Sequence, residues 1–439
     1  MAVQPLSVAG PAANRLRAGS VAFAVVEADD VRAEVRGWLE AHWDPDLSLV
    51  EWRTRLADAG WACPTWPVRW GGRGLAPALA ATVHEEIERA GAVGIPDGVG
   101  MSLAVPTILE HGDDDVKERF LRATVTGELR WCQLFSEPGA GSDLAGLTTR
   151  ADRDGDQWIV NGQKVWNTSA HHADVGLLLA RTDWDVPKHR GITCLIVPMR
   201  TPQVEVRPLR QMNGHASFNE VFFSDAPVPA GDVIGEVGAG WPVALTTLAH
   251  ERRLAPTRFA ASASATPGRV AREAAAEAAV AAEPYTWYPQ RAGRPDLVVE
   301  RARQTGMATD PIVRQQVARV LTLVRVAQWT QQRALAARRL GRPPGPEGSL
   351  GKLASSNIAR ASALVHAAMT GADAMLTGSD SPLGGTIAEI LVSVPAVSIA
   401  GGTDEIQHNI LGERILGLPK EPQVDRDLPF RDVPRNPGR

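Results

Sequence analysis

The hydrophobic period changes twice along this 439-residue chain, and no other feature of the sequence constrains its fold as much. Apolar residues recur at helical spacing up to about Gly127, β-rich runs follow, and helical spacing returns from Trp241 onward. Because helices and strands do not alternate, a sheet built from repeated βαβ units is excluded. The sequence predicts an α+β fold with an N-terminal α-helical domain at 29–128, a middle antiparallel β-domain at 129–238 and a C-terminal helical-bundle domain at 239–420.

Two segments show the helical pattern most clearly. Val31, Val35, Trp38 and Leu39 are spaced so that they share one face of a helix. A longer apolar stripe runs through Pro311–Arg339, which is predicted as a single long helix.

The middle zone carries strand signals. Asn161-Gly162 interrupts the β-rich run Trp158–Trp166, and this dipeptide suits the two central positions of a type I′ hairpin turn. We therefore expect a hairpin there, and a further strand at Ile192–Val197.

A segment at about 260–310 fits neither pattern and is predicted to be an insert. Ala260–Pro284 is rich in alanine and can form either a helix or a linker, of which the helix is favoured. Tyr285–Gln290 then concentrates aromatic residues in a chain that contains only 5% of them.

Charge and hydropathy exclude several classes of partner. With 46 Lys and Arg against 50 Asp and Glu, the net charge is −4, so no basic excess indicates nucleic-acid binding. No apolar run reaches the ~18 residues needed to span a bilayer. The first residues, up to Arg17, lack the apolar segment of a signal peptide, and we expect a cytoplasmic protein.

Cysteines and histidines offer no recognisable metal motif. The three cysteines, Cys63, Cys132 and Cys194, are far apart and form no CxxC pair, which favours free thiols in a reducing compartment. His171 and His172 are adjacent rather than four residues apart, so they are not two ligands on one helix face. We interpret them as loop histidines and predict no metal site.

The glycine-rich segment Ser136–Asp143 is the first candidate site. Its small residues permit backbone amides to approach a ligand closely, although such a segment by itself is also typical of an ordinary turn. It lacks the lysine of a P-loop.

Several further motifs accompany this segment in a fixed order, and together they resemble the acyl-CoA dehydrogenase family over about 37–419. The matching segments are Leu134–Asp143, Asn161–Thr168, Val228-Pro229, Gly402–Gln407, Asn409–Arg414 and Leu416–Pro419.

The resemblance implies a three-domain fold, assembly as an oligomer and FAD as the cofactor. It also implies that a base removes the α-proton of an acyl-CoA thioester while the β-hydrogen leaves as a hydride to the flavin. Electrons then pass to an electron-transferring flavoprotein, as in β-oxidation and related lipid metabolism.

By position, the resemblance assigns roles to individual residues. Those matched to FAD are Phe135, Ser136, Trp166 and Thr168 at the isoalloxazine ring, and Thr403 and Glu405 at the pyrophosphate–adenosine part. Those matched to the acyl-CoA substrate are Ser142, Arg252 and Gly402.

The catalytic base departs from the common pattern. Many relatives carry a glutamate in the loop before the last helix, where this chain has Gly401, which cannot accept a proton. Other relatives carry the glutamate on the first helix of the C-terminal domain, followed by arginine. Glu251-Arg252 matches that alternative, so Glu251 is the candidate base, although a solvated helix carboxylate is the simpler interpretation of Glu251 alone.

Two motifs that help to bind FAD across the subunit interface are also altered. Arg303–Gly306 is at most a remnant of Arg-x-x-Phe-Gly, and Ala372–Gly378 stands where Gln-x-x-Gly-Gly-x-Gly is usual. His408 replaces a common arginine. Either the aromatic insert or a different partner subunit is expected to supply the missing contacts.

Three hypotheses follow. The favoured one is an FAD-dependent acyl-CoA dehydrogenase in a homo-oligomer or in a heteromer with a related subunit. The alternatives are a non-catalytic subunit that completes the FAD sites of a heteromeric dehydrogenase, and a flavin oxidase or monooxygenase on the same scaffold.

Overall fold

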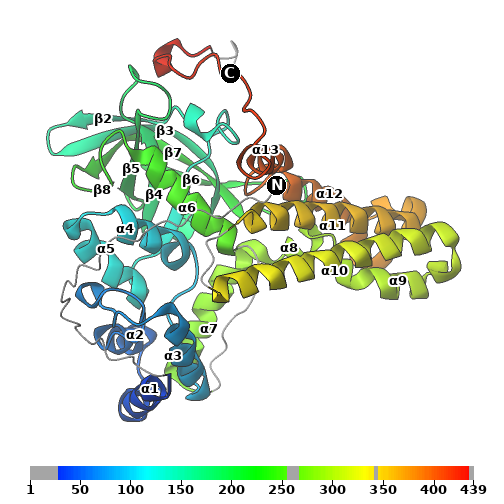
Figure 1. Ribbon diagram of the computed structural model, residues 1–439, viewed down its shortest axis with the longest axis horizontal. Coiled ribbons are helices and arrows are strands. Elements are labelled where there is room, and N and C mark those ends of the chain that lie inside the picture. Colours follow the sequence, from blue (N-terminus) through cyan, green and yellow to red (C-terminus); the bar gives the residue numbers. More distant parts are fainter. Residues whose placement is uncertain (1–27, 255–265, 341–344, 435–439) are drawn as a thin grey trace, which may run out of the picture.

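A computed structural model describes residues 28–254, 266–340 and 345–434 of the chain. Helices gather at both ends of the sequence and a single sheet lies between them (Figure 1). In the described parts of the chain, no helix is both long enough and apolar enough to cross a bilayer.

The N-terminal helices divide between two apolar cores, because the first three pack together while the last two pack mostly against the sheet. They are α1 (Ala28–His42), α2 (Leu49–Asp58), α3 (Pro77–Arg89), α4 (Val105–His111) and α5 (Asp114–Thr126). Val31, Val35 and Leu39 of α1 are buried, as the predicted stripe requires, and Trp38 packs against the same core. Ser48 and Glu51 form a capping box that fixes where α2 begins.

The middle zone is one eight-stranded sheet, in the order β6-β7-β3-β2-β4-β5-β8 with β1 beside β4. Its strands are β1 (Trp131–Leu134), β2 (Arg150–Asp154), β3 (Gln157–Thr168), β4 (Val175–Arg181), β5 (Ile192–Pro198), β6 (Val204–Leu209), β7 (Phe218–Pro229) and β8 (Val233–Ile234). Most neighbours are antiparallel, as predicted, but β1 runs parallel to β4, and β2 meets β4 in parallel at Arg150.

The predicted hairpin at Asn161-Gly162 is wrong. β3 runs through both residues, and the turn that joins β2 to β3 lies at Gly155 instead. Gly162 marks an irregularity in the pairing of β3 with β7. It has a φ of 149°, and a Cβ atom there would lie 2.7 Å from Thr149 Oγ1, so the position needs glycine for close packing.

The C-terminal zone is helical. Its helices are α6 (Gly240–Leu254), α7 (Arg269–Ala282), α8 (Tyr288–Arg291), α9 (Val298–Gln304), α10 (Pro311–Arg339), α11 (Glu347–Thr370), α12 (Thr386–Ser393) and α13 (Asp404–Arg414). α6 packs against β5 and α4, whereas α10 and α11 form a long pair that extends away from the sheet (Figure 1). α10 confirms the predicted long helix. The domain limits themselves remain predictions.

The alanine-rich segment is helical where it is described. α7 covers Arg269–Ala282, which favours the helix over the linker, while 260–265 lie outside the described residues. Glu277 of α7 forms an ion pair of 2.7 Å with the buried Arg53 of α2. Glu273 accepts a hydrogen bond of 2.7 Å from the Leu49 backbone N–H at the start of α2. The insert therefore packs against the N-terminal helices.

Candidate active site

The C-terminal end of β3 presents the two residues assigned to the flavin ring. A register shift between Lys164 and Asn167 marks a β-bulge, and Trp166 has a φ of 63°. Bulges of this kind redirect a side chain. Trp166 is accordingly 56% exposed although Val165 and Asn167 on either side are buried. Thr168 follows, half-buried, at the last position of the strand.

The segment Phe135–Glu137 lies beside this strand end. Val165 donates a backbone hydrogen bond of 2.9 Å to the Ser136 carbonyl. The Lys164 ammonium donates to the Phe135 carbonyl and to Glu137 Oε1, both at 2.9 Å. The structure thus brings Phe135 and Ser136 next to the strand that carries Trp166 and Thr168.

Glu137 is buried and fixes this segment by its charge. Its carboxylate accepts hydrogen bonds of 2.7 Å from the backbone N–H groups of Thr148 and Thr149. Burial raises the pKa of Glu137, but the Lys164 charge and these hydrogen bonds outweigh burial and hold the pKa at about 2. Glu137 is therefore ionised at neutral pH and neutralises the buried Lys164.

Glu251, the candidate base, approaches the same region from α6. Gln133 Nε2 lies 3.4 Å from Glu251 Oε2 and donates to it. Gln133 belongs to β1, two residues before Phe135, and its carbonyl accepts a 2.8 Å hydrogen bond from Asn167 Nδ2. Gln133 thus contacts both Glu251 and the residue between Trp166 and Thr168. The side chain of Arg252 lies outside the described residues.

These residues fit a flavin ring. An exposed indole offers a flat apolar surface that a planar ring can cover. Beside it, Asn167 Oδ1 is buried and has no hydrogen-bond partner in the described part of the chain, although buried acceptors are normally satisfied. This oxygen is enclosed by protein, so the exposed Trp166 indole is the feature of the strand end that fits a planar ring.

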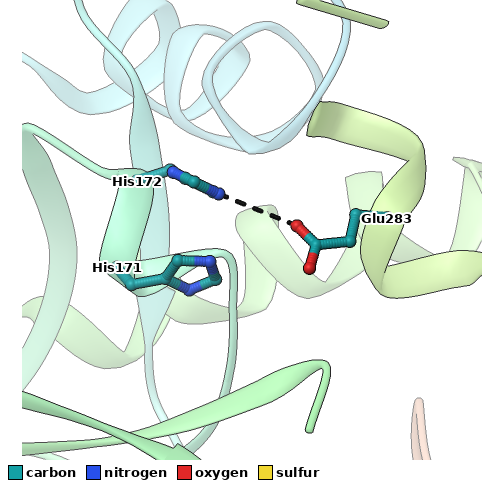
Figure 2. Close-up of side chains that lie close together, drawn as sticks. All are labelled: His171, His172 and Glu283. Carbon is teal, nitrogen blue, oxygen red and sulfur yellow. Dashed lines mark ion pairs between the residues drawn. The ribbon is translucent and has the colours of Figure 1, made fainter. Parts of the chain in front are cut away.

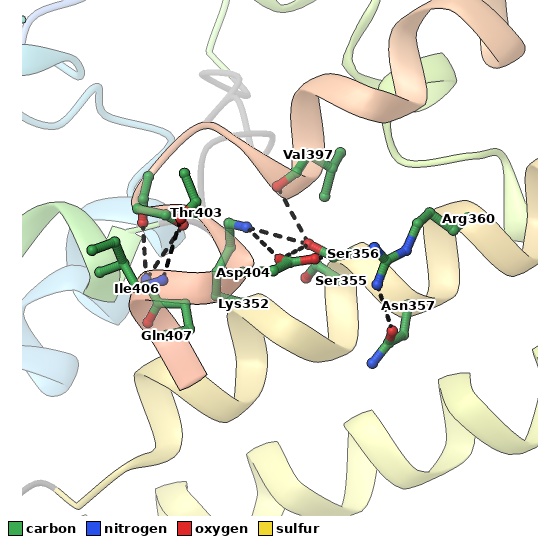
Figure 3. A network of polar contacts seen from close by, with 12 residues as sticks. Lys352, Ser355, Ser356, Asn357, Arg360, Val397, Thr403, Asp404, Ile406 and Gln407 are labelled. Carbon is green, nitrogen blue, oxygen red and sulfur yellow. Dashed lines mark hydrogen bonds and ion pairs between the residues drawn. The ribbon is translucent and has the colours of Figure 1, made fainter. Parts of the chain in front are cut away.

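A second cluster forms at the start of α13 (Figure 3). Thr403 caps the helix by accepting from the Ile406 backbone N–H at 3.2 Å. Asp404 is buried and accepts from Ser356 at 2.7 Å, and it pairs with Lys352 and Arg360 at 3.3 Å each. Burial raises the pKa of Asp404, but the hydrogen bonds from Ser356 and Lys352 lower it by more. The pKa therefore lies below its ordinary value, and the carboxylate stays charged.

This network holds the adjoining glycine loop. Gln407 Nε2 donates to the carbonyls of Gly401 and Gly402 at 3.4 Å each. Gly402 has a φ of 86°, and a Cβ atom there would meet Gln407 Nε2 at 2.6 Å. Glu405 is exposed in the first turn of α13, and the start of a helix is a place where backbone N–H groups commonly bind phosphates.

The predicted site residues therefore fall into two groups. Phe135, Ser136, Trp166 and Thr168 lie together, whereas Gly402, Thr403 and Glu405 lie together at the start of α13. Within the described residues, no hydrogen bond or ion pair joins these groups. Ser142 is exposed in the loop after Phe135–Glu137 and contacts neither group by a hydrogen bond recorded in this part of the chain.

The sequence analysis missed Gln133, Lys164 and Asn167. All three lie in or next to the matched motifs. For Lys164 and Asn167 a signal was available, because both lie within the matched segment Asn161–Thr168. No pattern connects Gln133 to Glu251, since that contact depends on how α6 packs on the sheet.

Comparison with known proteins agrees with this architecture. The chain matches the acyl-CoA dehydrogenase N-terminal domain at 15–128, the middle domain at 132–226 and the C-terminal domain at 296–416. It is 35% identical to acyl-CoA dehydrogenase IpdE1 of Mycobacterium tuberculosis over 90% of this chain and 99% of that one. It is 38% identical to acyl-CoA dehydrogenase FadE34 of the same organism, over 83% of this chain and 46% of that one.

Solved structures show the same fold. The ChsE4-ChsE5 complex from Mycobacterium tuberculosis is 26% identical, with a TM-score of 0.58 over 92% of this chain and 100% of the matched one. An acyl-CoA dehydrogenase from Geobacillus kaustophilus is 26% identical, with a TM-score of 0.56 over 90% and 100%. Three consecutive domain matches and a relative covered over nearly its whole length establish that this chain is a member of the acyl-CoA dehydrogenase family of enzymes, whose cofactor is FAD.

Proposed function

We propose that this chain catalyses the α,β-dehydrogenation of an acyl-CoA thioester, with Glu251 as the base that takes the α-proton. The observation that carries the proposal is the contact of 3.4 Å between the Glu251 carboxylate and Gln133, because β1 leads directly into the flavin-facing Phe135–Ser136 segment. Bound FAD supplies the acceptor for the hydride that leaves the β-carbon.

The remaining roles follow from position. Trp166 would cover the flavin ring and exclude water, and the Thr168 hydroxyl would donate a hydrogen bond that tunes the electronics of the ring. Phe135 and Ser136 line the ring from the neighbouring segment. Thr403 and Glu405 would hold the nucleotide end of the cofactor.

Substrate and partners are proposed on the same basis. Ser142, Arg252 and Gly402 bind the acyl-CoA, and an electron-transferring flavoprotein accepts the electrons. Because all three cysteines are buried free thiols, a reducing cytoplasmic location is part of the proposal.

A heteromeric assembly is a second candidate, in which this chain completes the FAD site of a related subunit. Apolar side chains of α10 support it, because Leu321, Val326 and Trp329 are 47, 50 and 60% exposed. The ChsE4-ChsE5 relative is a complex of two proteins, and the match to FadE34 leaves about half of that chain for a further segment.

Flavin bleaching tests both candidates. Purified full-length protein, with and without a co-expressed related subunit, would be mixed with a panel of acyl-CoA thioesters under anaerobic conditions. Bleaching by the chain alone supports a complete dehydrogenase, and bleaching only with the partner supports the heteromer. Release of peroxide in air without transfer to a flavoprotein acceptor would contradict both and indicate an oxidase.

A further inference from the structure

Two histidines and a glutamate from distant parts of the sequence converge beside the site. His171 and His172 form a short 3₁₀ turn (η4, Ala170–His172) directly after β3, and Glu283 begins another (η5, Glu283–Tyr285) directly after α7. One potential ligand atom from each residue lies within 4.8 Å of the other two (Figure 2). His172 Nε2 is 3.8 Å from Glu283 Oε2.

The His171 ring is held in place by a buried partner. Its Nδ1 lies 3.0 Å from the Oδ1 atom of Asn219, which is only 2% exposed. Because a carbonyl oxygen can only accept, Nδ1 carries the proton and Nε2 keeps its lone pair. Metal-binding histidines commonly donate their second nitrogen to such an oxygen, which fixes the tautomer.

The backbone before the turn is strained. Ser169 has a φ of 55°, in the left-handed region that non-glycine residues rarely adopt. The ring centroids of His171 and His172 lie 4.0 Å apart as a result of this turn. Strain of this kind persists where surrounding contacts enforce it, often at functional sites.

We propose that His171, His172 and Glu283 form a binding site for a divalent transition metal of the zinc class, completed by water. Two imidazole nitrogens and one carboxylate oxygen suit an ion with tetrahedral coordination, whose metal–ligand bonds are usually about 2.0–2.2 Å long. Donor atoms around such an ion lie about 3.4 Å from one another, so the three groups, now within 4.8 Å of one another, would have to move closer together when the ion binds.

The donor set also selects against other ions. Calcium takes 6–8 oxygen ligands, whereas this cluster offers a single carboxylate. Imidazole ligands favour zinc, copper or nickel over magnesium and calcium.

The metal would fasten the aromatic insert to the end of β3. Trp287, four residues after Glu283, donates from Nε1 to Ser217 Oγ at 3.1 Å and meets Phe218 edge to face at 6.4 Å. Phe218 in turn contacts Trp166 edge to face at 5.7 Å. An ion at this site would therefore stabilise the packing of the Trp287, Phe218 and Trp166 rings, the last of which is the tryptophan proposed to cover the flavin.

Metal titration of the full-length protein, with any affinity tag removed, tests the proposal. After treatment with EDTA and desalting, calorimetry with Zn²⁺ should show one saturable site per chain, and Co²⁺ should give a tetrahedral visible spectrum. Zn²⁺ should also raise the unfolding temperature, because it binds only the folded arrangement. Ca²⁺ and Mg²⁺ at equal concentration should do neither.

Variants locate the ion. His172→Asn and Glu283→Gln should each weaken Zn²⁺ binding by at least about 10-fold, the lower end of the losses typical even for the groups that orient metal ligands. His84→Asn, an exposed histidine on α3, should bind as the wild type does. Circular dichroism identifies any variant that fails to fold. If one of the two ligand variants fails to fold, the Zn²⁺ affinity of the other tests the proposal. Absence of a saturable site in the wild type, or equal binding by all three variants, would overturn the proposal.

Discussion

At the scale of single residues, Glu251 and Gly401 decide whether this chain is a complete catalyst. Abstraction of the α-proton needs a fixed base within reach of the substrate, and Gly401 offers none. Glu251→Gln keeps the shape of the side chain and its contact with Gln133 but removes its basicity. Flavin reduction by acyl-CoA should slow by about 10²–10⁴-fold while FAD and acyl-CoA still bind.

Single-turnover bleaching in a stopped-flow instrument measures this effect. Glu236→Gln is the matched control, because Glu236 is exposed just before α6 and should leave the rate unchanged. Near wild-type bleaching by Glu251→Gln would refute Glu251 as the base and leave Asp404, Glu405 or a partner's carboxylate to be tested.

The space beside Gly401 permits a rescue experiment. A Cβ atom at Gly401 would meet nothing within 4 Å, although its φ of 70° makes a side chain there cost about 1–2 kcal/mol. Adding Gly401→Glu to Glu251→Gln should restore part of the bleaching rate, since both positions are expected to face the same α-carbon. Gly401→Gln in the same background is the control and should restore none. Equal rates for the two double variants would show that the loop does not reach the substrate.

Thr168 is proposed to donate to the flavin and thereby tune its electronics. Thr168→Ala should shift the absorption spectrum or the reduction potential of bound FAD while the fold is kept. Thr309→Ala, at an exposed position before α10, should shift neither. An unchanged spectrum and potential would remove Thr168 from the cofactor site.

The site residues assigned to the flavin ring remain predictions, but the structure brings their two separate motifs side by side. Phe135 and Ser136 were expected near Trp166, and the hydrogen bond from Val165 to Ser136 places them there. The contact between Gln133 and Glu251 could not be predicted, because it joins a strand and a helix whose packing no local pattern encodes.

At the scale of elements, the buried pair of Lys164 and Glu137 holds the segment Phe135–Glu137 against β3. Removing one partner leaves an uncompensated buried charge, so Glu137→Gln should lower the free energy of unfolding by about 3–5 kcal/mol at pH 7. Urea unfolding measures this loss, with the exposed Glu118→Gln as control. A loss under 1 kcal/mol would mean that Lys164 is neutral or hydrated when folded.

The same pair sets a pH dependence with a definite sign. Because the pKa of Glu137 is about 2 when folded and about 4.5 when unfolded, its contribution is fully present above pH 4.5. It is lost as the pH falls toward 2. The wild type should therefore lose more stability than Glu137→Gln over this range.

Elements were predicted well where one face is apolar and poorly where a turn motif was interpreted alone. α1 and α10 lie where their apolar spacing indicates. The Asn161-Gly162 hairpin failed because tertiary pairing with β7 absorbs the dipeptide as an irregularity within a strand. The parallel pairing of β1 with β4 was also missed, since strand direction depends on the path of the chain between them.

At the scale of the whole molecule, the order of helical, β and helical zones was visible in the sequence, but the assembly was not. α10 exposes Leu321, Val326 and Trp329 on a helix pair that extends from the sheet (Figure 1). A periodic stripe predicts that a helix face is buried, but it does not say whether the chain itself or a partner buries it.

The altered interface motifs lead to the last prediction. Acyl-CoA dehydrogenases that complete each other's FAD sites need donor residues on both sides of the interface, and Arg303–Gly306 and Ala372–Gly378 lack the usual ones. The chain expressed alone should therefore contain clearly less than one FAD per chain, by absorbance against protein mass. Co-expression with a related subunit should raise that ratio and give a hetero-oligomer by native mass spectrometry.

Trp329→Glu should weaken that assembly, because it places a charge in a face that the partner must dehydrate. Arg325→Glu on the same helix is the comparison variant, because it changes charge without removing apolar area, and it should weaken the assembly less. One tightly bound FAD per chain in a pure homo-oligomer would contradict the idea that this chain lacks half of the interface contacts to FAD. It would indicate that the insert that carries Trp287 supplies those contacts instead.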